Sequence, residues 1–140
     1  ILALAKHNKT ATKGVDSTSS SLEAVEAAQF LNEKFGAVVV ISGAVDIIVS
    51  EAGITQLKNG DSLMTKITGM GCSATALLAA FIAVIPNRTE AAIAATALMA
   101  VAGELAAQNS TGPGSLQVGI LDKLHNISET EFLNTTTILA

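Results

Sequence analysis

The feature that most constrains this chain is a glycine turn that runs directly into a long apolar segment. Residues 66–72 read Lys-Ile-Thr-Gly-Met-Gly-Cys, and no charged residue follows until Arg88. This pattern predicts a turn that opens a helix, whose first N–H groups lack internal partners and carry partial positive charge. Gly69 and Gly71 would let the backbone approach a phosphate closely. The segment is therefore a candidate anion site, with an ordinary tight turn as the alternative.

Three side chains of this segment are candidates for chemistry. Cys72 falls in the first turn of the predicted helix, where positive charge favours a thiolate able to take up a proton. A free cysteine is usually a small buried hydrophobe, so that role stays open. Thr68 either contacts a phosphate or ends the preceding strand. Lys66 either neutralises phosphate charge or forms a surface ion pair.

The composition excludes some classes of protein. The 140 residues suffice for one domain with its own core. The net charge of −4 and the absence of Trp and Tyr argue against a nucleic-acid partner. One cysteine allows no internal disulfide and fits a reducing cytoplasm. The first residue is Ile1 rather than Met, and we expect the chain to be part of a longer polypeptide.

The first half of the sequence alternates helical and strand patterns. Residues 1–5 suggest the tail of a helix, 7–14 a polar loop, and 19–34 a helix that ends at Gly36. The run at 37–41, Ala-Val-Val-Val-Ile, is typical of a strand buried on both faces of a parallel sheet.

Two more strands are expected after this run. They fall at 46–50 and 54–57 and are joined by a turn at 51–53. Asn59-Gly60 is then interpreted as a hairpin tip, and residues 63–67 lead into the glycine turn.

The second half is predicted to be mainly helical. Two helices, at 72–85 and 91–103, are apolar on all sides but too short to cross a bilayer, so we expect them buried in a core or an oligomer. Ser115 would cap a third helix at 116–125. A capping box at 128–131 precedes a short helix, and residues 135–139 suggest an edge strand. His7 and His125 are isolated and are expected at the surface.

Several sequence motifs of this chain resemble those of the hydroxyethylthiazole kinases, thiamine-salvage enzymes of the ribokinase-like superfamily. Other members of that superfamily usually carry Asp at the position of Cys72, and cysteine there marks the thiazole kinases. At Ser42 the family has Thr, so the hydroxyl is kept. The resemblance covers nearly the whole chain but only the C-terminal half of such a kinase. The motifs are Thr-Lys-Ile-Thr-Gly-Met-Gly-Cys at 65–72, Gly-Val-Asp-Ser at 14–17, Ser-Gly-Ala-Val-Asp at 42–46 and Gly-Pro-Gly-Ser at 112–115.

The resemblance implies an α/β fold: the C-terminal half of a ribokinase-like three-layer α/β/α domain, with a mostly parallel sheet flanked by helices. Residues 1–140 would form one part of a single kinase domain. The implied activity is ATP- and Mg²⁺-dependent phosphorylation of 4-methyl-5-(2-hydroxyethyl)thiazole. Gly69 would lie at the substrate, and Cys72 would accept or orient the hydroxyl proton. The residues expected to bind the nucleotide or its phosphates are Ser42, Thr68, Gly69, Met70 and Gly71.

The resemblance also implies what this chain lacks. The family's N-terminal half supplies a nucleotide-binding arginine, a metal-associated acidic residue and much of the thiazole pocket. We therefore expect no metal ligand here, an inactive isolated chain, a companion N-terminal segment or chain, and a cytoplasmic homotrimer without nucleic-acid or membrane partners. Two alternatives remain open: another ribokinase-like kinase acting on a pyrimidine or sugar alcohol, and a non-catalytic Ala-rich helical assembly module.

Overall fold

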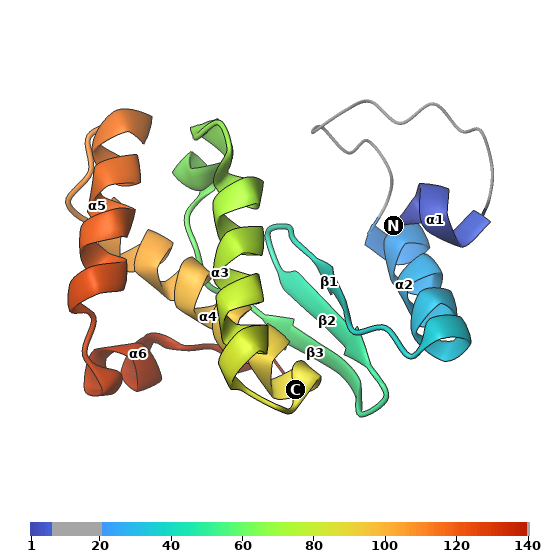
Figure 1. Cartoon of the computed structure of the whole chain (residues 1–140). Coiled ribbons are helices and arrows are strands. Elements are labelled where there is room, and N and C mark those ends of the chain that lie inside the picture. Colours follow the sequence, from blue (N-terminus) through green and yellow to red (C-terminus); the bar gives the residue numbers. More distant parts are fainter. Residues whose placement is uncertain (7–20, 140) are drawn as a thin grey trace.

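A computed structural model describes residues 1–6 and 21–139, which form three layers (Figure 1). A four-stranded sheet has α2 on one side and α4 on the other, and α3 and α5 pack against α4. The predicted loop at 7–14 and the motif at 14–17 lie outside the described residues. In chain order the elements are α1 (Leu2–Lys6), α2 (Ser21–Phe35), β1 (Val39–Ile41), β2 (Asp46–Ser50), β3 (Gly53–Leu57), the 3-10 helix η1 (Ser62–Lys66), α3 (Met70–Val84), α4 (Arg88–Ala107), α5 (Pro113–Asn126), α6 (Glu129–Thr135) and β4 (Ile138–Leu139).

The sheet has the order β1-β2-β3-β4, and each described pair of neighbours is antiparallel. The α/β class is confirmed, but the expectation of a mostly parallel sheet is wrong for these strands. The reason lies in the connections: residues 42–45 and 51–52 are too few for a crossover, and such short loops join only antiparallel strands. The strands predicted at 46–50 and 54–57 are present.

The run at 37–41 forms a shorter and less buried strand than predicted. Only Val39–Ile41 are in β1, and all three residues are half-buried rather than buried. Its one partner among the described strands is β2, with Val40 opposite Ile48. The other edge of β1 therefore has no strand beside it within the described part of the chain.

The core lies on both sides of α4. Toward the sheet, Ile48 and Leu57 pack with small residues of this helix, among them Ala92. Toward α5 and the glycine turn, α4 contributes Met99 and Ala106 to a second cluster. Because most of these α4 side chains are alanines, neighbouring elements approach the helix axis closely.

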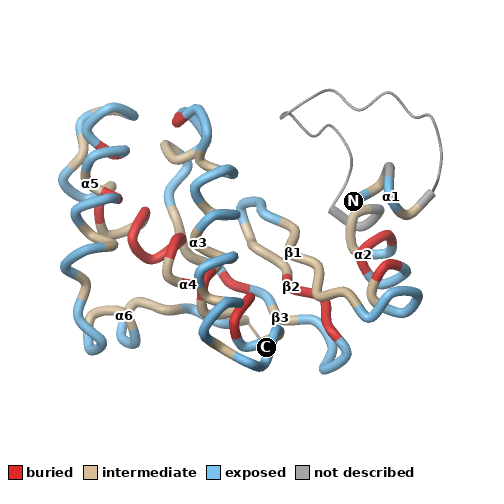
Figure 2. Tube along the Cα trace, in the orientation of Figure 1, coloured by how far each residue is buried: buried red, intermediate tan, exposed pale blue. Residues whose placement is uncertain are grey.

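Both apolar helices were expected to be buried in a core or an oligomer, and within this chain only α4 is buried. In Figure 2, α4 carries several buried segments, whereas α3 contains no buried residue. Helix α4 is also longer than the predicted apolar run: its 20 residues reach the length and apolarity of a membrane span, but 56% of the most apolar window is buried within the protein. Such burial is typical of a core helix rather than one that faces lipid.

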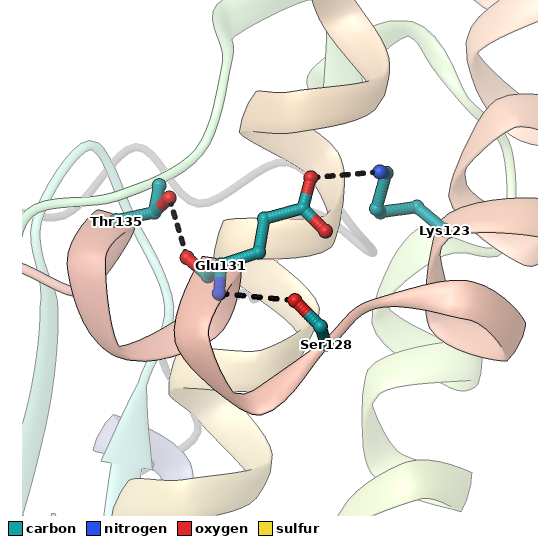
Figure 3. Close-up of polar contacts among 4 residues, drawn as sticks. All are labelled: Lys123, Ser128, Glu131 and Thr135. Atoms are coloured by element: carbon teal, nitrogen blue, oxygen red, sulfur yellow. Dashed lines mark hydrogen bonds and ion pairs between the residues drawn. The ribbon is translucent and has the colours of Figure 1, made fainter.

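The C-terminal part returns to the sheet through α6 (Figure 3). Ser128 Oγ accepts a hydrogen bond from Glu131 N at 3.2 Å, so the predicted cap is present. The Glu131 carboxylate pairs with Lys123 of α5 at 3.0 Å, and Thr135 Oγ1 donates to the Glu131 carbonyl. Beyond α6, Ile138 lies opposite Leu57 of β3, which confirms the expected edge strand.

Candidate functional site: the glycine turn and its surroundings

The glycine turn is joined to the fold by η1. At the start of η1, Asp61 Oδ1 accepts a hydrogen bond from Leu63 N at 2.8 Å. At its end, Ile67 N donates to the Met64 carbonyl at 3.1 Å, and the Ile67 side chain is buried in the cluster beneath α5. The turn at 68–71 thus extends toward solvent from an anchored residue.

Gly69 shapes the turn itself. It is the N-cap of α3 with φ +84°, a left-handed conformation that favours glycine. The helix then begins at Met70, and its first N–H group with a clear helical partner is that of Ser73, which donates to the Gly69 carbonyl at 3.0 Å. Within the described part of the chain, the N–H groups of Gly71 and Cys72 have no hydrogen-bond acceptor.

Side chains cap α4 and α6, whereas α3 and α5 begin at glycines, which have no side chain to act as a cap. Asn87 Oδ1 accepts hydrogen bonds from two N–H groups of α4, and Ser128 caps α6. Glycine at position 69 cannot provide such an acceptor. The N-terminus of α3 therefore keeps free donors and partial positive charge, the features that an anion site requires.

The side chains around this helix end are accessible. Thr68 and Cys72 are exposed, and Met70 is half-buried. Cys72 is therefore not buried by any described residue of this chain. Lys66 is exposed and forms no ion pair with any described residue, so the expected surface ion pair is not present among them.

Ser42 lies at a second loop, directly after β1. The loop is closed by Asp46, whose Oδ1 accepts a hydrogen bond from Gly43 N at 2.9 Å. Burial raises the pKa of the Asp46 carboxyl above its usual 3.8, and the hydrogen bond from Gly43 acts in the opposite direction. Ser42 itself is exposed. In Figure 1 this loop and the N-terminal ends of α3 and α5 all face the same, upper end of the molecule.

The motif at 112–115 begins α5, but its serine does not cap the helix as predicted. Gly112 is the N-cap, and Ser115 lies inside the first turn. Ser115 Oγ accepts hydrogen bonds from Thr111 N at 3.0 Å and Gly112 N at 3.2 Å. The serine therefore folds the preceding loop back onto the helix. Since α5 packs against η1, this second glycine-containing helix start adjoins the segment that leads into the turn.

Sequence reasoning missed two residues near the site. Asn59-Gly60 is not a hairpin tip, because η1 rather than a strand follows β3. Instead, the Asn59 side chain donates to Glu104 of α4. The available signal was Glu104 itself, the single charge of α4 beyond its first turn, since a carboxylate in an apolar helix needs a polar partner. The described residues contain no group of three or more His, Cys, Asp or Glu side chains suited to a metal ion, and His125 is exposed as expected.

Comparison with known proteins gives one consistent result. The model of the hydroxyethylthiazole kinase family matches residues 1–130. The chain is 45% identical to a hydroxyethylthiazole kinase of Syntrophus aciditrophicus over 140 residues, all of this chain and 52% of that protein. It is 50% identical to one of Leptospira biflexa over 117 residues, 84% of this chain and 44% of that protein.

A solved structure agrees with the sequence comparison. The hydroxyethylthiazole kinase from Pyrococcus horikoshii OT3 superposes with a TM-score of 0.77 at 29% identity, covering 84% of this chain and 46% of that structure. The chain thus spans about half the length of the curated relatives that it matches.

Proposed function

The chain belongs to the hydroxyethylthiazole kinase family, and we propose that it forms the phosphate-binding part of an enzyme that phosphorylates 4-methyl-5-(2-hydroxyethyl)thiazole with ATP. The observation that carries this proposal is the uncapped start of α3, where the N–H groups of Gly71 and Cys72 have no acceptor among the described residues. Phosphoryl transfer depends mainly on positioning and on stabilising charge, and such donors supply both.

Each residue of the glycine turn is assigned a role in binding the substrate or the phosphoryl group. The left-handed Gly69 aims the first turn of α3 outward, and we assign it to the substrate side. The N–H groups of Gly71 and Cys72 would hold the transferred phosphoryl group, with Thr68 beside it. We assign the Met70 N–H to the same group, although in this structure it donates to the Ile67 carbonyl at 3.4 Å. Ser42, exposed at the same end of the molecule, would contact the nucleotide.

Cys72 is the residue that we assign to the substrate hydroxyl. Its thiol is exposed at the helix end that would hold the phosphoryl group. Its sulfur could accept or orient the hydroxyl proton while the substrate oxygen attacks the γ-phosphorus of ATP and ADP leaves. Because the transition state for phosphoryl transfer is loose, help from a base is smaller than the stabilisation of charge.

Mg²⁺ and ATP are part of the proposal, but the described residues alone do not fit a metal site, since they offer no cluster of three or more ligating side chains. Mg²⁺ usually keeps several waters and binds phosphates with one or two carboxylates. We expect the other half of the kinase to provide the carboxylate, in agreement with the acidic residue that the resemblance assigns to it.

A companion half is supported by the exposed surfaces of this chain. The outer edge of β1 has no described partner strand and carries no charged side chain, although exposed edges are normally protected. Helix α3 is mostly apolar, carries no charged residue and has no buried residue. We propose that the other half of a cytoplasmic enzyme covers these surfaces, within the homotrimer that the resemblance implies, and that this chain alone is inactive.

The test is a phosphorylation assay of the full-length protein with ATP and the thiazole alcohol, run beside the isolated chain. We expect activity only in the full-length protein. In Cys72→Ala, kcat should fall by about 10²–10⁴ if the thiol acts as a general base, with little change in the KM for ATP. Cys72→Ser keeps a polar group of similar size and serves as the matched variant.

The same assay separates the alternatives. If the protein is another ribokinase-like kinase, one member of a panel of pyrimidine and sugar alcohols should be phosphorylated faster than the thiazole. No phosphorylation of any panel member by folded full-length protein would favour a non-catalytic module and overturn the proposal. An unchanged kcat in Cys72→Ala would show that the thiol takes no part in the reaction. The proposal that the glycine turn binds phosphate would then remain.

A further inference from the structure

A polar contact joins α4 to the loop between β3 and η1. Glu104 Oε2 accepts a hydrogen bond from Asn59 Nδ2 at 2.8 Å and a second from Gly60 N at 3.1 Å. Both donors belong to consecutive residues, so one carboxylate oxygen fixes both the side chain and the backbone of this loop. Hydrogen bonds to a charged acceptor are stronger than those between neutral groups.

Asn59 also binds the C-terminal segment. Its Nδ2 donates to the Thr135 carbonyl at 2.9 Å, and its Oδ1 accepts from Thr137 N at 2.7 Å. Next to these bonds, Lys58 N donates to the Thr137 carbonyl at 3.0 Å, so the side chain extends the ladder between β3 and β4. One asparagine thus ties together α4, the end of α6 and the start of β4.

A second contact holds η1 against the same turn of α4. Met64 lies directly over Gly103, and a Cβ added to Gly103 would come within 2.3 Å of Met64 Sδ. Gly103 and Glu104 are neighbours in α4. They therefore hold the segment 59–64 at two points, one polar and one apolar.

Between the contacts made by Gly103 and Glu104 and the glycine turn, the chain has little freedom. Asp61 caps η1, η1 occupies residues 62–66, and Ile67 is buried against α4 and α5. The turn at 68–71 follows at once. A change in the orientation of residues 59–61 would be passed through this short rigid segment to the first turn of α3.

We propose that Asn59 and Glu104 are positioning residues, which fix the direction of the Gly71 and Cys72 N–H groups and the position of the Cys72 thiol. They do not touch the substrate; they act through η1. The catalytic consequence rests on the proposed function, whereas the effect on the turn itself does not. A displacement of a reacting group by about 1 Å can lower the rate 10²-fold.

The experiment compares variants of the full-length protein. Glu104→Ala removes the acceptor for both N–H groups, while Glu104→Gln keeps one oxygen that can accept both. Asn59→Asp loses the amide donor that binds both Glu104 and the Thr135 carbonyl, and it sets a second carboxylate against Glu104. It keeps the oxygen that binds Thr137 N. The matched control is Glu131→Ala, which breaks the 3.0 Å pair with Lys123 between α5 and α6 (Figure 3).

Two readouts are measured. In Glu104→Ala and Asn59→Asp, hydrogen exchange of a peptide spanning residues 60–72 should rise while exchange in the β2–β3 hairpin stays unchanged, and kcat should fall about 10- to 100-fold with a smaller change in the KM for ATP. Glu104→Gln should show hydrogen exchange and kcat close to those of the parent, and Glu131→Ala should leave both quantities unchanged.

The outcomes are distinguishable. Unchanged exchange across residues 60–72 in both disruptive variants, or a kcat that falls equally in Glu131→Ala, would overturn the positioning role. If the parent protein phosphorylates no alcohol, the proposed function fails, and the exchange measurement alone decides whether Asn59 and Glu104 order the turn. If Glu104→Ala does not fold, Asn59→Asp and Glu104→Gln provide the comparison.

Discussion

Gly103 of α4 and Met64 of η1 are in direct contact, so close that the space for a Cβ at position 103 is filled by the methionine. A Cβ at this position would be 2.3 Å from Sδ, 2.6 Å from Cε and 3.2 Å from Cγ. The contact brings the segment before the glycine turn onto the core helix. Alanine at position 103 would therefore require the Met64 side chain to move.

Gly103→Ala should destabilise the full-length protein. Overpacking costs about 1–3 kcal/mol, while alanine in a helix recovers about 1 kcal/mol relative to glycine, so we expect a net loss of about 1 kcal/mol in urea unfolding. The penalty should disappear when the change is made in a Met64→Ala background. Gly114→Ala in α5 is the control, because its Cβ would meet nothing within 4 Å. An equal penalty in both backgrounds would contradict the contact.

Gly69 and Gly71 should respond differently to alanine. Gly69 has φ +84°, so Gly69→Ala should cost about 1–2 kcal/mol of stability. A Cβ at Gly71 meets no described atom within 4 Å, and alanine favours the helix, so Gly71→Ala should be at least as stable as the parent. If a phosphate approaches the backbone here, both variants lose phosphorylation activity. A fully active Gly71→Ala would argue against close approach of the phosphate.

Asp46 should make stability depend on pH. Its pKa is higher in the folded than in the unfolded chain, because burial disfavours the charged form. Such a carboxyl contributes stability below its unfolded pKa, and this contribution is lost as the pH rises through the folded pKa. Asp46→Asn keeps an oxygen for Gly43 N and should be more stable than the parent at pH 7.

The gain from Asp46→Asn should vanish below about pH 4, where the parent carboxyl is protonated in both states. Urea midpoints of parent and variant at both pH values measure the difference, with exposed Asp122→Asn in α5 as the control. A variant less stable than the parent at neutral pH would show that the Asp46 charge stabilises the loop.

Two leucines of α5 provide a matched test of burial. Leu116 is fully buried beneath the glycine turn, whereas Leu121 is 64% exposed. Leu116→Ala should cost about 2–5 kcal/mol, and Leu121→Ala less than about 0.5 kcal/mol if this face meets only solvent. Chemical unfolding of both variants in the full-length protein gives the values. A cost at Leu121 similar to that at Leu116 would show that another part of the full-length protein covers this face.

Much of the local structure could be predicted because its signals are close together in the sequence. The hairpin at 46–57 follows from two apolar runs around a short turn, and Ser128 caps α6 through its neighbour Glu131 N. The start of α3 was predicted two residues late, at Cys72 rather than Met70. That Gly69 opens this helix is a local property of glycine, which tolerates positive φ.

Other features depend on partners that no local pattern reveals. The direction of the sheet was predicted wrongly because a β-branched run is compatible with either kind of ladder, and the short connections decide it. Helix α3 looks as apolar as α4, yet only α4 lies between the sheet and other helices. Burial is a property of neighbours, which composition does not specify.

By itself, then, the sequence determined the turn that begins α3, the free N–H donors that follow Gly69 and the family to which the motif points. The tertiary structure decided what holds that turn in place. Asn59 meets Glu104, 45 residues away, and Thr137, 78 residues away. Hydrogen bonds between distant segments leave no periodic signal, because each requires that the whole fold bring its two groups within about 3 Å.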